Sequence, residues 1–204
     1  MCRPCIGGGT VSSARDYRRL DDLALAARWG NEAAFAEIFE TLYPKVYSFL
    51  WRRTARPEDV EEIAAETFVS VFKGLKIFEP AYEGAFSAWV FRIARHRLID
   101  RIRKDSGSRE QLVDPVDLHE AEADQADEVI DPAELPSGSD LADAVAALPE
   151  AQRSCILLRF VADMSIDQVA DVMERTPNAI KQLQFRALSN LRQDPSLRQL
   201  RGES

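Results

Sequence analysis

The stretch FSAWVFRIARHRLIDRIRK, residues 86–104, decides how the rest of the chain is interpreted. It contains no Gly or Pro, so it can form a single helix. On a helical wheel one stripe is apolar and consists of Phe91, Ala94, Leu98 and Ile102. The opposite side combines cations with an aromatic ring and an aliphatic side chain, namely Arg92, His96, Arg103, Trp89 and Ile93. Either this is an Arg-rich helix with some exposed apolar surface, or it is a surface that binds phosphates and stacks on unpaired bases.

Length and composition are ordinary for a soluble globular protein. The chain has 204 residues, of which 46% are hydrophobic and 29% are charged, so one or two domains are expected. No apolar run approaches the roughly 20 residues that span a bilayer. The N-terminus lacks the apolar core of a secretory signal. We therefore expect a cytoplasmic protein with no membrane insertion.

The net charge of −8 is unexpected for a nucleic-acid-binding chain, but the charge is unevenly distributed. Residues 105–143 hold thirteen acidic residues and one basic residue, a net charge of −12. Residues 1–104 carry seventeen basic and fourteen acidic residues, and residues 144–204 carry eight and seven. Since the local charge decides which surface meets an anion, two mildly basic segments are predicted on either side of an acidic one.

The three cysteines predict neither a disulfide framework nor a closed metal site. Cys2 and Cys5 have the C-x-x-C spacing of half a zinc site, but the two histidines, His96 and His119, lie far from them in sequence. We expect no metal and no cofactor, and the role of these two cysteines stays open. The stretch GGGTV suits a ribosome-binding sequence followed by a GTG start codon, so we also expect the natural chain to begin at Val11.

Helical patterning begins near Leu20 and is interrupted at Gly30. A third helix is predicted from Pro57, which suits a first helical turn, to Gly74. Its predicted core face is Val60, Ile63, Ala64, Thr67, Phe68 and Val71. Its outer face is Asp59, Glu62, Glu66, Val69 and Lys73. A connection rich in aromatic residues, with Phe78, Tyr82 and Phe86, then leads into residues 86–104.

The C-terminal part predicts a helix-turn-helix. Ser165 and Gln168 form a capping-box pattern at the start of one helix. Thr176 and Pro177 then supply an N-cap and a first helical residue for a longer helix that ends before Pro195. Its inward residues are Ile180, Leu183, Ala187 and Leu191, and its outward residues are Asn178, Lys181, Gln182, Phe185, Ser189 and Arg192. Polar side chains at this place can read base edges in the major groove, although a plain helical hairpin would share the pattern.

Taken together, these motifs resemble the extracytoplasmic function sigma factors, group 4 of the sigma-70 family of bacterial RNA polymerase. The stretch VEEIAAETFVSVFKGL is similar to the segment that docks on the clamp helices of the polymerase β′ subunit. Residues 86–104 are similar to the segment that melts and reads the −10 element. The stretch from ALPEAQRSC to ALSNLR is similar to the domain that reads the −35 element.

The resemblance implies an all-α fold: two small helical domains joined by a flexible acidic linker, the C-terminal one a helix-turn-helix. We expect a disordered N-terminus at 1–19, a region 2-like domain at 20–104, a linker at 105–139, a region 4-like domain at 140–194 and a tail at 195–204. The expected partners are core RNA polymerase, through its β and β′ subunits, promoter DNA and an anti-sigma factor. The expected function is promoter recognition and melting; an enzyme is not expected.

The resemblance also assigns site residues. Polymerase binding is expected at Asp59, Glu62, Glu66 and Val69. Binding of the −10 element is expected at Phe78, Tyr82, Phe86, Trp89, Arg92, Arg95, His96 and Arg103, where the arginines meet phosphates and the aromatic rings hold a flipped base. Binding of the −35 element is expected at Thr176, Asn178, Lys181, Gln182, Phe185, Arg186 and Arg192.

Two departures from the family pattern and two other functions stay open. His96 stands where Asn is common, and Glu174 stands where Gly is common; a left-handed conformation there would cost Glu about 1 kcal/mol relative to Gly. The alternatives are a stand-alone helix-turn-helix regulator, which leaves Glu62 and Glu66 unexplained, and a helical adaptor, which leaves the cationic face with Arg92 unexplained. The acidic linker is either a passive spacer or a segment that enters a basic polymerase channel.

Overall fold

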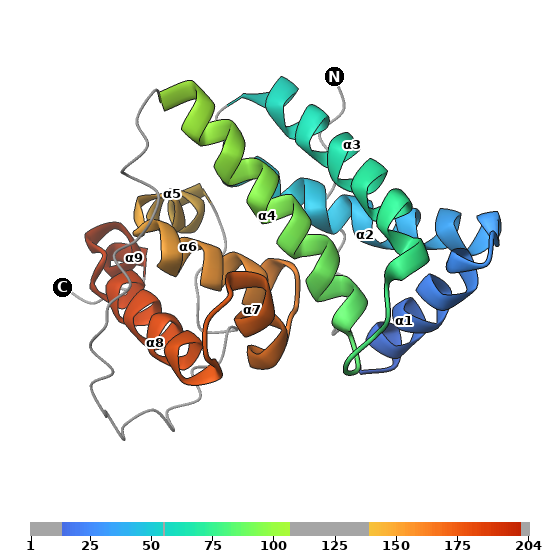
Figure 1. Ribbon diagram of the computed structural model, residues 1–204. Coiled ribbons are helices and arrows are strands. Elements are labelled where there is room, and N and C mark those ends of the chain that lie inside the picture. The colour runs from blue at the N-terminus through green and yellow to red at the C-terminus, as the bar shows by residue number, and fades with distance from the viewer. Residues whose placement is uncertain (1–13, 55, 107–138, 201–204) are drawn as a thin grey trace.

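The computed structural model describes residues 14–54, 56–106 and 139–200 (Figure 1). All regular elements in these three ranges are helical, so the predicted all-α fold is confirmed. The N-terminal elements are α1 (Ala14–Arg28), α2 (Glu32–Trp51), α3 (Pro57–Gly74), the single turn η1 (Leu75–Ile77) and α4 (Ala85–Ser106). The C-terminal elements are α5 (Ser139–Ala147), α6 (Glu150–Ile156), the π-helical turn η3 (Leu157–Val161), α7 (Ile166–Met173), α8 (Pro177–Gln193) and α9 (Pro195–Leu200).

Helix α4 runs through the centre of the molecule (Figure 1). Helices α1, α2 and α3 pack on one side of it, and α7 packs on another. The predicted apolar stripe lies in the core, with Phe91, Ala94 and Leu98 fully buried. Val90 and Ile99 are buried as well, so apolar residues occupy more than one face of α4. A continuous apolar core therefore extends from the N-terminal helices across α4 to α7.

The start of α4 is held by a residue from a different helix. The carboxylate of Asp21, in α1, accepts hydrogen bonds from the backbone N–H of Gly84 at 2.6 Å and of Phe86 at 2.9 Å. N–H groups in the first turn of a helix have no partner within that helix, so the Asp21 side chain acts as the N-cap of α4. Burial raises the pKa of Asp21, while the two N–H donors favour its charged form. The contact fixes α1 against the loop that precedes α4.

A second, smaller core holds the C-terminal helices together. It joins α5, α6, α8 and α9 through Leu148, Ile156, Leu188, Leu191 and Leu197. The π-helical turn η3 continues α6 and carries Leu157 and Leu158 into the larger core instead. The two helices of the helix-turn-helix thus pack in both cores: α7 lies in the larger core, and α8 contributes to the smaller one.

The helical part is longer at both ends than the sequence predicted. Helix α1 begins at Ala14, not near Leu20, and Arg18 in its added turn pairs with Glu83 at 2.6 Å. The expected tail contains α9, which forms because Leu197 is buried against the smaller core. Val11, Cys2, Cys5, His119 and most of the acidic linker lie outside the described residues.

Replacing Phe91 by Ala should lower the free energy of unfolding by about 3–5 kcal/mol, because it leaves a cavity in the core. Phe91 is fully buried and packs edge-on against Phe49, with ring centroids 5.6 Å apart. Ile77→Ala is the matched control, since Ile77 is 85% exposed and its loss should stay within about 0.5 kcal/mol. Urea unfolding followed by circular dichroism measures both; similar losses for the two variants would contradict the central position of α4.

Candidate nucleic-acid interface

The cationic side of α4 faces α7 in this structure. The guanidinium of Arg92 donates to the carboxylate of Asp171 at 2.9 Å, and His96 Nε2 lies 3.5 Å from a carboxylate oxygen of Glu174. The hydroxyl of Tyr82 donates to the same Asp171 carboxylate at 2.8 Å. Burial, followed by this hydrogen bond, raises the pKa of Tyr82. Three residues expected to bind the −10 element are thus brought together around one acidic turn of α7.

The expected aromatic residues form a cluster of their own. Phe78 stacks on Trp89 with centroids 5.1 Å apart and meets Phe86 edge-on at the same distance. Phe86 is completely buried and Phe78 nearly so, and therefore neither ring can stack on a base in this arrangement. Trp89 is half-buried, and its ring lies so close to Gly74 that a Cβ there would come within 2.7 Å.

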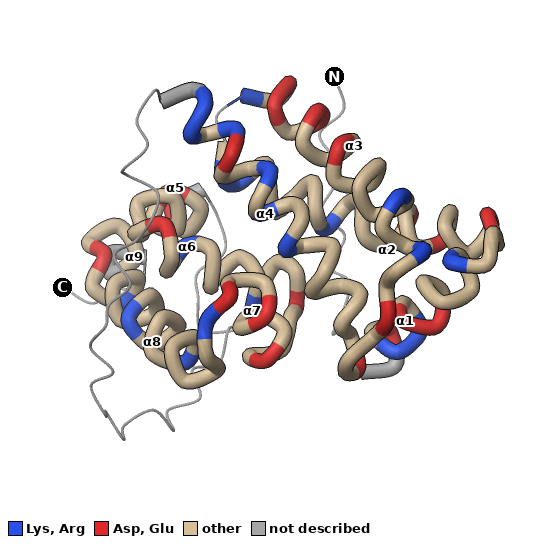
Figure 2. Tube along the Cα trace, in the orientation of Figure 1, with Lys and Arg blue, Asp and Glu red and all other residues tan. Residues whose placement is uncertain are grey.

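The two remaining basic residues of the expected −10 set differ in position. Arg95 is half-buried in the middle of α4. Arg103 is exposed in the last turn, 4.0 Å from Asp100. The cations of α4 accordingly extend from Arg92 to the C-terminal end of the helix, as the blue segments in Figure 2 show, while its first two turns carry none.

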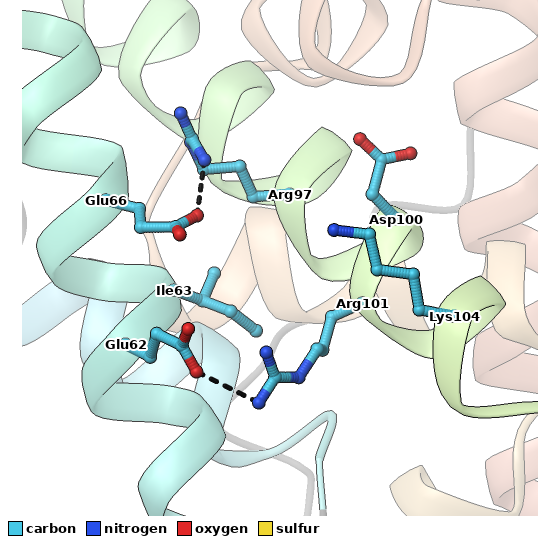
Figure 3. Close-up of a pocket in the computed structure, with 7 residues that line it drawn as sticks. All are labelled: Glu62, Ile63, Glu66, Arg97, Asp100, Arg101 and Lys104. Atoms are coloured by element: carbon cyan, nitrogen blue, oxygen red, sulfur yellow. Dashed lines mark hydrogen bonds and ion pairs between the residues drawn. The ribbon is translucent and has the colours of Figure 1, made fainter.

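The outer face predicted for α3 is only partly exposed. Glu62 pairs with Arg101 at 2.9 Å, and Glu66 pairs with Arg97 (Figure 3). These residues line a charged groove of about 130 Å³ between α3 and α4. Asp59, which was predicted to face outward, is 3% exposed because its carboxylate turns toward Arg101 and forms an ion pair with it. The hydrogen bond to Asp59 raises the pKa of Arg101.

Aromatic residues on α2 and α3 form an exposed surface that was not predicted from the sequence. Rings at every fourth position of α2 lie in one row: Phe35, Phe39, Tyr43, Tyr47 and Trp51. Phe72 on α3 is 62% exposed and meets the ring of Phe35 edge-on at 5.1 Å. Val69, the apolar residue expected to bind the polymerase, is also exposed on α3. The four-residue spacing in the sequence is the signal that could have revealed this row.

The predicted helix-turn-helix forms α7 and α8. Ser165 N–H donates to Gln168 Oε1 at 2.8 Å and Gln168 N–H donates to Ser165 Oγ at 3.2 Å, which confirms the capping box. Thr176 Oγ1 accepts from the backbone N–H of Ala179 at 3.2 Å, which confirms the second N-cap. Glu174, between the two helices, adopts a left-handed conformation with φ 56°. The turn therefore contains a left-handed residue although Glu, and not Gly, occupies this position.

One side of α8 is open to solvent. Ile180, Ala187 and Leu191 are buried as predicted, while Leu183 is half-buried. The exposed residues of the expected −35 set are Thr176, Asn178, Lys181, Phe185 and Arg186, and the half-buried ones are Gln182 and Arg192. An amide, an ammonium and a ring on one helical surface offer base-edge contacts, and the guanidinium of Arg186 can meet phosphate.

Within the described residues, no group of three or more possible ligands could hold a metal ion, and no helix is long and apolar enough to cross a bilayer. Cys155 lies buried in the core, and burial raises the pKa of its thiol to about 12. A thiol in this state has little nucleophilic character. The described residues that were expected to act in binding thus offer cations and aromatic rings.

Comparison with known proteins gives a family for each half of the chain. Residues 38–107 match sigma-70 region 2, and residues 139–191 match sigma-70 region 4. The ECF RNA polymerase sigma factor RpoE of Cereibacter sphaeroides is 35% identical over 169 residues, which are 81% of this chain and 88% of that protein. The ECF RNA polymerase sigma factor BldN of Streptomyces coelicolor is 30% identical over 178 residues, which are 86% of this chain and 66% of that protein.

Two solved structures share the fold. CnrH, in complex with the cytosolic domain of CnrY, aligns with a TM-score of 0.62 and 20% identity over 91% of this chain and 99% of that one. The sigma factor RpoE of Bartonella quintana, in complex with the anti-sigma factor NepR, aligns with a TM-score of 0.57 and 21% identity over 78% and 94%. At these identities the likeness concerns the arrangement of the helices alone.

Replacing Glu174 by Gly should raise the free energy of unfolding by up to about 1 kcal/mol, because Gly adopts the left-handed conformation without a Cβ clash. Glu174→Ala is the control: it also removes the carboxylate near His96 but keeps the Cβ. Urea unfolding of both variants isolates the backbone contribution. A Gly variant no more stable than the Ala variant would show that the turn carries no strain.

Proposed function

The chain belongs to the ECF sigma factors of the sigma-70 family, and we propose that it is a group 4 factor that positions core RNA polymerase through α3, α4 and α8. Directing promoter recognition is the function of such a factor, while the polymerase carries the catalytic centre. The observation that supports these assignments best is the order of the matches, with region 2 over residues 38–107 and region 4 over residues 139–191. A stand-alone helix-turn-helix regulator would account for the second match only.

In the proposed division of labour, residues 20–104 bind the −10 element. The guanidinium groups of Arg92, Arg95 and Arg103 add phosphate contacts, whose strength falls with salt. Tyr82 and Trp89 are the rings that a base can reach most readily, since both keep part of their surface exposed. Stacking contributes about 1–3 kcal/mol per base, which is comparable to the cost of unpairing one. The buried rings of Phe78 and Phe86 would then fix the position of the Trp89 ring, which both of them contact.

Residues 140–194 are proposed to bind the −35 element. The N-terminal turns of α8 expose Asn178 and Lys181, the positions from which a recognition helix reaches base edges. Arg186 and Arg192 lie further along and would bind phosphates. Thr176 has a structural part as well, because its hydroxyl caps α8.

The polymerase is proposed to bind α3 through Glu62, Glu66 and Val69. The exposed Val69 is the apolar centre of this surface, and Phe72 extends it toward the aromatic row of α2. Asp59 is left out because its buried carboxylate is committed to Arg101. An anti-sigma factor is proposed as a competing partner, since the RpoE of Bartonella quintana is bound to one in its structure. We place the protein in the cytoplasm with the polymerase.

The test is run-off transcription with purified core RNA polymerase on fragmented genomic DNA from the source organism, followed by sequencing of the transcripts. Adding the chain should produce new starts, and the sequences upstream of them should share two motifs near −10 and −35. Core polymerase alone is the control. If the chain bound DNA with the same affinity whether or not core polymerase was present, the stand-alone regulator would be favoured instead.

Lys181→Ala should weaken holoenzyme binding to the −35 duplex by about 1–3 kcal/mol, concentrated at one base position, if Lys181 reads a base edge. Lys76→Ala is the matched control, since it removes the same charge from an exposed position in η1 that is in none of the proposed binding sets. Fluorescence anisotropy with duplexes substituted at single positions measures both. A uniform loss across all duplexes would reassign Lys181 to a phosphate.

A further inference from the structure

Helix α7 covers the same residues that are proposed to bind the −10 element. The carboxylate of Asp171 contacts the guanidinium of Arg92 at 2.9 Å and the hydroxyl of Tyr82 at 2.8 Å. Glu174 follows one turn later, 3.5 Å from His96. Two acidic residues of the C-terminal domain therefore contact a guanidinium, a hydroxyl and an imidazole of the N-terminal one. Figure 1 shows α7 beside the N-terminal half of α4.

The contact is a packed interface and not only an exchange of surface charges. Gln168, at the start of α7, is 2% exposed and donates from Nε2 to the backbone carbonyl of Gly84 at 3.1 Å. Gly84 adopts φ +84°, and an added Cβ there would overlap the Gln168 side chain. Val169, Val172 and the N-terminal helices share one apolar core. Separating α7 from α4 would thus expose apolar area as well as ion pairs.

A second polar link joins the two domains away from α4. Arg53, in the turn after α2, forms an ion pair with Glu150 and donates to Ser154 Oγ at 2.6 Å, both in α6. Its side chain is almost completely buried, and this burial lowers its pKa to about 10. Removing Glu150 would leave this cation buried without its ion-pair partner, which is costly, so a substitution there should shift the chain toward the open arrangement.

The closed arrangement cannot serve both promoter elements at once. Elements centred about 25 base pairs apart lie on the order of 85 Å apart along B-DNA, at about 3.4 Å per base pair. In the structure α4 and α7 are in direct contact. If α4 reads one element and the helix-turn-helix reads the other, the two domains must separate when the promoter is bound.

We propose that Asp171 is an internal competitor of promoter DNA: in the closed chain its carboxylate takes the place of a backbone phosphate on Arg92 and Tyr82. Carboxylate and phosphate oxygens accept charge-assisted hydrogen bonds from a guanidinium in the same way, so one can replace the other. This inference rests on the proposed function of α4. It adds that the free factor holds its own −10 surface closed, and that an open fraction of the chain sets the apparent affinity.

The test compares Asp171→Asn with Asp167→Asn in the full-length protein. Asp167 lies on the same helix and is exposed, so its replacement removes an equal charge without breaking the interface. The probe is a fluorescein-labelled single-stranded oligonucleotide with the −10 sequence of a promoter on which the wild-type holoenzyme gives a run-off transcript. Asp171→Asn should bind it about three- to tenfold more tightly than Asp167→Asn, because the open fraction rises.

A double-mutant cycle with Arg92→Ala locates the effect. The gain from Asp171→Asn should shrink in the Arg92→Ala background, because only the Tyr82 hydroxyl is left to release. Small-angle scattering should show a larger radius of gyration for Asp171→Asn than for Asp167→Asn. Glu150→Gln provides a second variant. It weakens the ion pair between Arg53 and Glu150, away from α4, and should also increase the open fraction.

Equal affinities of the Asp171 and Asp167 variants, both correctly folded by circular dichroism, would overturn the proposal. So would a gain of the same size without Arg92, since the effect would then not act through the ion pair between Arg92 and Asp171. Failure of the proposed function has a different signature: no promoter then yields a run-off transcript with the wild-type chain, and no probe can be chosen.

Discussion

The burial of α4 on two sides is the constraint on which the rest of the structure depends. A surface helix leaves one face to water, but α4 has the N-terminal helices on one side and α7 on the other. Apolar residues such as Phe91 and Leu98 fill the first contact, and Val90 adds to the core from a neighbouring face. The many arginines of this helix must then find partners at the edges of two interfaces. This explains why a strongly basic helix sits at the centre of an acidic protein.

Those partners determine how the charges are used. Arg97 and Arg101 pair with acidic residues of α3, and Arg92 pairs with Asp171 of α7. A cation that is already paired offers a polyanion less than a free one, because the internal partner must first be displaced. The same residues thus contribute to the closed fold and to the proposed DNA contact, and opening the closed fold would cost these hydrogen bonds together with the apolar area that α7 buries.

Local chemistry could be predicted from the sequence and was confirmed. The capping box at Ser165 and the N-cap at Thr176 follow from contacts three residues apart, so no knowledge of the tertiary structure is needed. The core stripe of α4 follows from helical periodicity in the same way. The left-handed conformation of Glu174 was not predicted, because Glu adopts it at a cost and the sequence left the geometry of this turn open. The ends of the helical part were predicted less well, because α9 depends on a buried contact of Leu197.

The sequence by itself determined the helices, their caps, their apolar stripes and the family. Only the tertiary structure decided which polar residues are free to bind anything. Asp59 was predicted to face outward from its place on the wheel, but it is buried because Arg101 of another helix reaches it. Phe86 was expected at a nucleic-acid surface, but its ring lies in the core. Arg92 meets Asp171 across 79 positions of sequence. Periodicity assigns a side chain to a face of its own helix, whereas its partners come from helices whose placement depends on the packing of the whole core.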